Sequence, residues 1–107
     1  MHLQVITLLA GVGFGAVCGF AGFFAYHFFA LAKRPSVDRS TRYAAAIWVL
    51  LAFVAGAHAG INLWLGTSSP QVAQRFVTLG YVNIASGFLT CLALGWVATS
   101  LLRQSRR

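Results

Sequence analysis

The sequence has almost no acidic residues and few charges of either sign. One aspartate, Asp38, stands against eight lysines and arginines among 107 residues, and charged residues make up 8% of the chain. Soluble domains carry about 25% charged residues, so this chain lacks the polar surface that a soluble protein of its size needs. The scarcity of carboxylates also argues against a proton-coupled transporter, whose pathway normally requires them.

Cysteines and catalytic motifs are scarce as well. The two cysteines, Cys18 and Cys91, lie in apolar stretches without a CxxC or Cys/His spacing, so we interpret them as structural thiols and predict no metal site. No Ser/His/Asp or Cys/His nucleophile arrangement is present, and the glycine-rich run GVGFGAVCG lies inside an apolar stretch rather than after a strand. We therefore expect no catalytic residues and no enzyme activity.

Hydrophobic residues are abundant, at 59% of the chain with a mean hydropathy of +0.77. They form three stretches, approximately residues 3–32, 43–65 and 77–102, and each exceeds the about 20 residues that a membrane helix needs. The two connections contain both prolines, and Ser36 and either Ser68 or Ser69 are candidate helix caps. The predicted fold class is an all-α integral membrane protein, with residues 1–107 forming a single three-helix domain.

The positions of the basic residues predict an orientation. The first connection holds four of them and the C-terminal tail three, whereas the second connection holds one and the N-terminus none. Because short cytoplasmic segments are enriched in lysine and arginine, we predict an up-down-up bundle with the N-terminus outside and the C-terminus in the cytoplasm. The predicted location is a bacterial inner membrane, cytoplasmic or intracytoplasmic. Clustering of the charges at helix ends argues against nucleic-acid binding.

Small residues recur along the first two stretches. We interpret six glycines as helix-packing positions, within the chain or against a second copy or another protein: Gly11, Gly15, Gly19, Gly22, Gly56 and Gly60. Close packing through small residues is what holds helices together in lipid. The other side of the first stretch forms an aromatic ridge that we expect to face lipid, a larger partner or a pigment: Phe14, Val17, Phe20, Phe24 and Phe28.

Polar side chains inside the second and third stretches predict a network between helices. His58 and Asn62 lie one turn apart, and the third stretch carries Asn83, Ser86 and Thr90 on one stripe. Counting about 1.5 Å per residue from the cytoplasmic ends brings His58 level with Ser86, and Asn62 level with Asn83. Because an unpaired polar group in hydrocarbon is costly, we predict interhelical hydrogen bonds among these five residues.

A histidine in a membrane helix is also a candidate ligand of haem b or (bacterio)chlorophyll, which makes His58 and His27 candidate cofactor-binding residues. They differ by roughly 15 Å in depth, so they cannot both ligate one iron. The run HAGINLW, which starts at His58, resembles the haem-ligating helix of the membrane-anchor subunit of succinate dehydrogenase. This chain has TSSPQ where that family has an Asp-Tyr pair, and its predicted orientation is opposite, so we do not assign it to that family.

Three roles remain open from the sequence. The first is a small non-catalytic accessory subunit of a larger bacterial membrane complex, respiratory or photosynthetic, that acts by helix packing and makes pigment, quinone or lipid contacts. Its partners would be membrane lipids and larger integral membrane subunits, with a homo-oligomer as a further option. The second role is a self-oligomerising holin-like pore former, and the third is a b-type haem membrane anchor.

Overall fold

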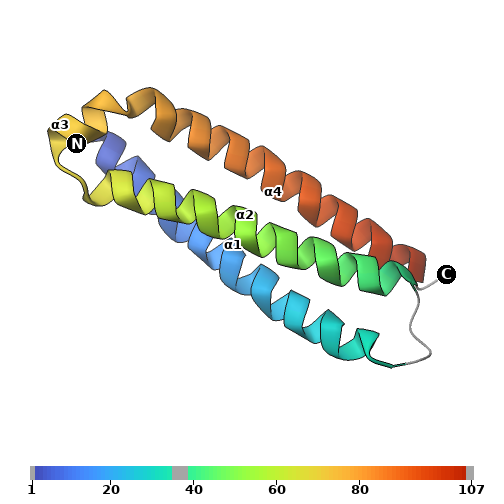
Figure 1. Cartoon of the computed structure of the whole chain (residues 1–107). Helices are drawn as coiled ribbons and strands as arrows, with labels where there is room; N and C mark the ends of the chain where they lie inside the picture. Colours follow the sequence, from blue (N-terminus) through green and yellow to red (C-terminus); the bar gives the residue numbers. More distant parts are fainter. Residues whose placement is uncertain (1, 35–38, 106–107) are drawn as a thin grey trace.

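The three apolar stretches fold into three long helices in the computed structural model, which describes residues 2–34 and 39–105 (Figure 1). The elements are α1 (His2–Ala32), α2 (Arg39–Thr67), α3 (Pro70–Arg75) and α4 (Val77–Ser105), with no strand in the described residues. Each of α1, α2 and α4 is long and apolar enough to cross a membrane. This confirms the predicted all-helical fold class and indicates a multi-pass membrane protein.

The second helix begins earlier than the apolar pattern predicts. α2 starts at Arg39 and includes Arg42, whereas the sequence suggested a start at Tyr43. No proline or glycine follows Pro35 in this connection, and the long arginine stems can lie along a helix while their guanidinium groups stay in water. Helical structure therefore extends past the apolar run into the basic residues.

The second connection is partly helical. Ser69 caps the short helix α3, because its hydroxyl oxygen accepts a hydrogen bond from the backbone N–H of Val72 at 3.4 Å, and Pro70 follows at the first turn. Ser69 was one of the two caps proposed for this connection. The other predicted cap, Ser36, lies outside the described residues.

Helix α2 lies between its two neighbours. It packs along both α1 and α4, whereas α1 and α4 have little contact with each other (Figure 1). The start of α1 lies beside the end of α2, where a Cβ atom on Gly66 would meet the side chain of Leu8. The bundle is long and narrow, with extents of 56 × 19 × 14 Å.

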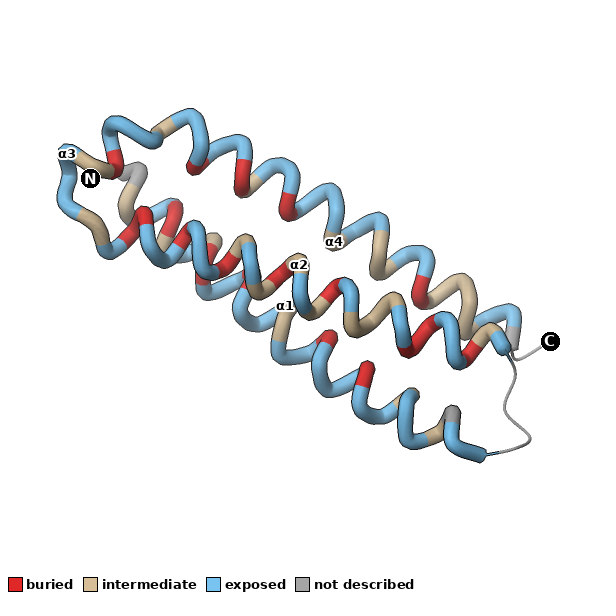
Figure 2. Tube along the Cα trace, in the orientation of Figure 1, coloured by how far each residue is buried: buried red, intermediate tan, exposed pale blue. Residues whose placement is uncertain are grey.

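Buried positions recur along α1 at alternating spacings of four and three residues (Figure 2). The buried and half-buried positions of this stripe are Thr7, Gly11, Phe14, Cys18, Ala21, Ala25 and Phe28. A seven-residue repeat is typical of helices that pack nearly in parallel with a slight left-handed twist. Several buried residues of α2 are small, including Ala44, Ala45, Ala55 and Ala59, which lets the neighbouring helices approach α2 closely.

The four glycines of α1 that we interpreted as helix-packing positions differ in how closely they approach α2. A Cβ atom on Gly11 would lie 2.7 Å from Leu63, but at Gly15, Gly19 and Gly22 it would meet nothing within 4 Å. Each step of four residues turns about 40° beyond a full helical turn. Gly15 and Gly19 therefore rotate progressively away from the contact that Gly11 makes.

The aromatic ridge is divided by the same rotation. Phe14, which we expected to face outwards, is only 7% exposed and lies between the helices. Phe20 remains 67% exposed on the outer surface of α1. Phe24 is 36% exposed, and it packs against Trp48 of α2 with the ring centroids 5.0 Å apart.

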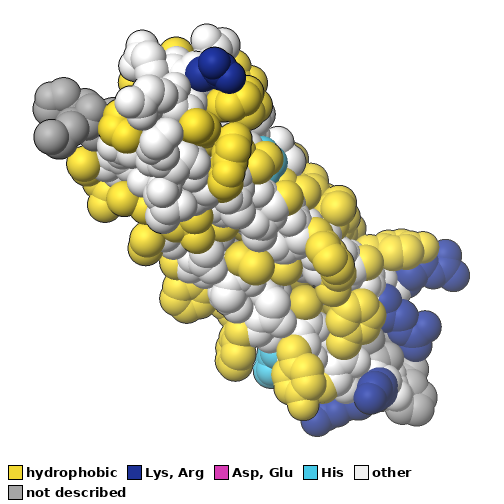
Figure 3. All heavy atoms as spheres, turned by 60° about the vertical axis from the view of Figure 1, so that its left-hand side comes forward, with side chains coloured by type: hydrophobic (Ala, Val, Ile, Leu, Met, Phe, Trp, Pro, Cys, Tyr) yellow, Lys and Arg dark blue, Asp and Glu magenta, His cyan; other side chains and the backbone are white. Residues whose placement is uncertain are grey.

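The basic side chains gather at one end of the bundle (Figure 3). The end of α1, the start of α2 and the end of α4 all lie at this end, and its exposed basic residues are Lys33, Arg34, Arg39, Arg42 and Arg103. Arg75, also exposed, lies at the opposite end in α3. The described part of the bundle is therefore strongly polarised in charge along its length.

We expect Gly11→Ala and Gly15→Ala to change stability in opposite directions. The added methyl group at Gly11 overlaps Leu63 and forces the helices or that side chain to move, at a cost of about 1–3 kcal/mol. The same change at Gly15 enters open space and stabilises by about 0.5–1 kcal/mol through helix propensity. Unfolding in mixed detergent micelles, followed by circular dichroism, measures both. Equal effects at the two positions would contradict the observed packing.

Candidate functional site

A polar cluster inside the bundle centres on the main-chain carbonyl group of His58. This oxygen accepts a hydrogen bond from the Asn62 side-chain amide at 2.9 Å, within α2. It also accepts one from the Asn83 side-chain amide of α4 at 3.2 Å. Asn62 is fully buried and Asn83 is 6% exposed, so both bonds form away from the surroundings of the bundle. Asn83 thereby ties α4 to the backbone of α2.

The imidazole ring of His58 has a defined tautomer in this arrangement. Its Nδ1 atom lies 2.7 Å from the carbonyl oxygen of Val54, and because a carbonyl only accepts, Nδ1 carries the proton. In the neutral ring, Nε2 is then an acceptor. The hydroxyl group of Ser86 on α4 lies 3.5 Å from Nε2 and 3.3 Å from the carbonyl oxygen of Asn83. The serine proton can serve either acceptor.

All three long helices meet at the His58 ring. The Phe14 ring of α1 lies 5.6 Å from it, at an interplanar angle of 44°. On α4, a Cβ atom at Gly87 would come within 2.6 Å of both His58 Cδ2 and Phe14 Cζ. Gly87 is therefore required by this close approach, and its lack of a side chain makes room for both rings.

The buried cluster contains one polar atom without a partner. Asn62 Oδ1 makes no hydrogen bond, although the side-chain nitrogen of the same residue is bound to the His58 carbonyl group. Leaving a buried acceptor unpaired costs about 1–3 kcal/mol. Asn62 thus stabilises the cluster less than Asn83 does, even though it is the more deeply buried of the two.

The predicted polar residues are only partly brought together. His58, Asn62, Asn83 and Ser86 form one cluster, whereas Thr90 is exposed one turn further along α4. Gly56 lies close to α1, since a Cβ atom there would be 3.3 Å from the sulfur of Cys18. A Cβ atom at Gly60 would meet nothing within 4 Å.

The second histidine, His27, lies in a different environment. It is exposed on the outer side of α1, and its ring makes an edge contact with Phe28 at 5.2 Å. His27 follows Phe14 by 13 residues, so it lies about 20 Å along the axis from the level of His58. The two histidines cannot bind one cofactor together.

Metal binding by side chains finds no support in the described residues. They contain no group of three or more His, Cys, Asp and Glu side chains that could hold an ion. Cys18 and Cys91 are free and half-buried on different helices. The hydrogen bonds of the His58 cluster link α4 to α2 and also run within each of these two helices.

Phe14 is the member of the site that the sequence interpretation missed. A glycine stripe with a spacing of four residues placed Phe14 on the outer ridge. The buried positions of α1 instead alternate between spacings of four and three residues, and this pattern runs from Thr7 through Gly11 to Phe14. Gly87, by contrast, directly follows Ser86, which the sequence analysis placed on the polar stripe of the third stretch. The seven-residue repeat of buried positions along α1 would have predicted that Phe14 is buried.

Replacing the two asparagines by leucine should separate their contributions. Asn83→Leu removes the hydrogen bond between α2 and α4, and we expect it to destabilise by about 0.6–2 kcal/mol. Asn62→Leu removes both a hydrogen bond and the unpaired Oδ1, so we expect a change within about 0.5 kcal/mol. Detergent unfolding of both variants measures the difference. A larger loss from Asn62→Leu would show that its Oδ1 atom has a partner.

Comparisons of the chain with protein-family models, with characterised proteins and with solved structures found no match. The function must therefore be inferred from the helices, the polar cluster and the surfaces that they leave open.

Proposed function

We propose that the chain is a small non-catalytic accessory subunit of a larger bacterial membrane complex, respiratory or photosynthetic, and that it acts by packing its helices against bigger subunits. The described elements are three membrane-length helices joined by short segments, so most of the surface available for contacts would lie in the bilayer. The His58 ring and the Asn83 side chain bond within and between helices, which supports a packing role.

The observation that carries this proposal is the open groove between α1 and α4. These two helices barely touch, and an apolar groove of about 570 Å³ lies between them. Small residues line it from both sides, Ala10 and Gly13 on α1 and Ala85 on α4, together with the Phe14 ring. Small residues let a further helix come close, which is how helices associate in lipid. A helix of a partner subunit in this groove would complete a four-helix arrangement.

The groove is connected to the polar cluster through Phe14. The same ring that lines the groove also packs against His58 and above Gly87. A partner helix pressing on Phe14 would therefore act directly on the most constrained part of the bundle. Binding of a partner helix would in this way stabilise the folded chain.

The charge distribution supports the proposed orientation. Five described basic residues lie at one end and Arg75 alone lies at the other (Figure 3). Lysine and arginine are retained on the cytoplasmic side of membrane proteins. We therefore infer an up-down-up course, with the basic end and the C-terminus in the cytoplasm.

Co-purification in mild detergent tests the proposal. We expect the tagged chain to bring down larger membrane subunits, and Gly13→Leu to reduce their yield several-fold by filling the groove. A Cβ atom at Gly13 meets nothing within 4 Å, so the variant chain should still fold. Gly60→Leu, in equally open space on α2 and away from this groove, is the matched control and should retain the partners. Recovery of the chain alone from native membranes would contradict the proposal.

Two further readouts separate the alternatives from this role. Induced expression of a holin-like pore former releases cytoplasmic enzymes at a set time, whereas an accessory subunit does not. The absorption spectrum of the purified chain reports whether haem or chlorophyll is bound.

A further inference from the structure

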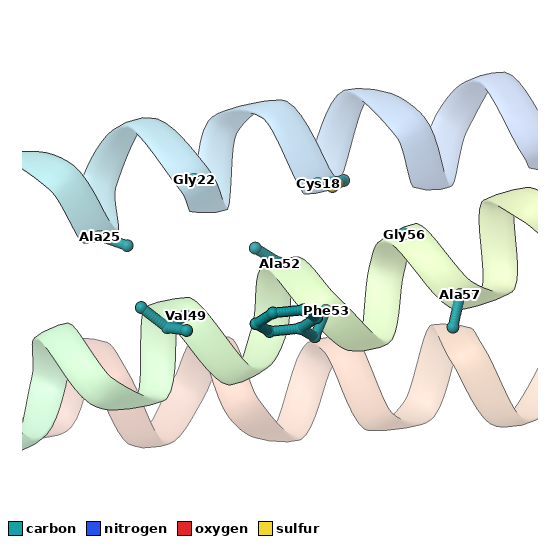
Figure 4. A pocket seen from close by; sticks show the side chains of 8 residues that line it. All are labelled: Cys18, Gly22, Ala25, Val49, Ala52, Phe53, Gly56 and Ala57. Atoms are coloured by element: carbon teal, nitrogen blue, oxygen red, sulfur yellow. The ribbon is translucent and has the colours of Figure 1, made fainter.

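A second apolar groove lies between α1 and α2 (Figure 4). Its volume is about 610 Å³, and its walls are made mostly of small residues. Figure 4 shows Cys18, Gly22 and Ala25 of α1 across from Val49, Ala52 and Gly56 of α2. These side chains offer almost no hydrogen-bonding groups, so the groove suits a hydrocarbon occupant.

Basic residues lie beyond one end of this groove, on α2 and directly after the end of α1. Arg42, Val49 and Gly56 are spaced seven residues apart, which returns to nearly the same face of α2 every two turns. Arg42 thus lies on the face that lines the groove, about 10 Å along the axis from Val49. On α1, Lys33 and Arg34 directly follow the last helical residue, and all three basic side chains are exposed.

We propose that this face of α1 and α2 is a binding site for an anionic phospholipid. The phosphate group lies among Lys33, Arg34, Arg39 and Arg42, and one acyl chain runs along the groove from Ala25 and Val49 towards Cys18 and Ala57. The proposal needs the bundle to lie in a bilayer, and it is independent of the accessory role.

Charge complementarity selects this occupant. Eight basic residues face one acid in the whole chain, and five of the basic residues are exposed at this end of the bundle. Cations gathered at one end of a narrow bundle repel one another, and counter-charges between them relieve this repulsion. Anionic headgroups supply those charges at the depth where the helices end, and basic clusters at this position in membrane proteins bind them. The apolar groove, which begins at Ala25 and Val49 on the same two helices, favours a phospholipid over a free phosphate ion.

Quenching by brominated lipids tests the site in the full-length chain. Trp48 precedes the groove residue Val49 and packs against Phe24, so it reports on this region. A chain carrying Trp64→Phe and Trp96→Phe keeps only this tryptophan. This chain is reconstituted with brominated phosphatidylglycerol or with brominated phosphatidylcholine. We expect the anionic lipid to quench Trp48 fluorescence several-fold more strongly, and this ratio is the lipid preference.

Two pairs of variants make the test specific. Arg42→Gln should lower the preference about fivefold, the effect of one basic residue near the surface, whereas Arg75→Gln at the opposite end should leave it unchanged. Gly22→Leu fills the groove and should reduce quenching by phosphatidylglycerol, whereas Gly15→Leu, on the same helix and also in open space, should not. Circular dichroism verifies that each variant is folded.

Several results would overturn the proposal. Equal quenching by the two lipids, or equal losses from Arg42→Gln and Arg75→Gln, would mean that no phosphate site exists at this end. A loss with Arg42→Gln but none with Gly22→Leu would mean that headgroups adsorb on the basic end without a chain in the groove.

Losses with both Arg42→Gln and Gly22→Leu, and with neither control, would establish the site.

Discussion

Apolar helices gain nothing from leaving lipid for one another, so this bundle depends on how closely its backbones approach. One glycine on each long helix marks such an approach. A Cβ atom on Gly11 of α1 would overlap Leu63, on Gly66 of α2 it would overlap Leu8, and on Gly87 of α4 it would overlap His58. Together these contacts fix α2 in the middle of the bundle. The seven-residue repeat of buried positions follows from the same requirement, because it keeps one stripe of α1 against α2 along its whole length.

The polar cluster fixes how the packed helices are registered along their axes. Van der Waals contacts between small residues tolerate sliding, whereas the hydrogen bond from Asn83 to the His58 carbonyl group fixes the register of α4 on α2. The contact of Phe14 with His58 extends that register to α1. Because α1 and α4 barely contact each other, an apolar groove stays open between them, and a second groove lies between α1 and α2 where both helices carry small residues. The proposed roles in assembly and in lipid binding both arise from this incomplete closure.

Hydropathy was sufficient to predict the three membrane-length helices and their approximate limits, because runs of this length have few alternatives. Counting residues from the basic ends brought His58 level with Ser86, and the structure places the two side chains 3.5 Å apart. The glycine pattern was less informative. A spacing of four residues suggested a single stripe, but a helix of 3.6 residues per turn carries Gly15 and Gly19 away from Gly11. Phe14 was assigned to the wrong side for the same reason, and the open grooves depend on distances between helices that no sequence pattern encodes.

The central claim is the registration of α1 on α2 through their small residues, and a disulfide bond tests it most directly. A Cβ atom at Gly56 lies 3.3 Å from the sulfur of the native Cys18, which is compatible with disulfide geometry. In the variant Gly56→Cys, mild oxidation should link the two helices within one chain, with loss of two free thiols by mass spectrometry. Gly60→Cys, one turn away in open space, should leave all three thiols of that variant free. Failure of Gly56→Cys to form the bond, or equal bonding at both positions, would contradict the account.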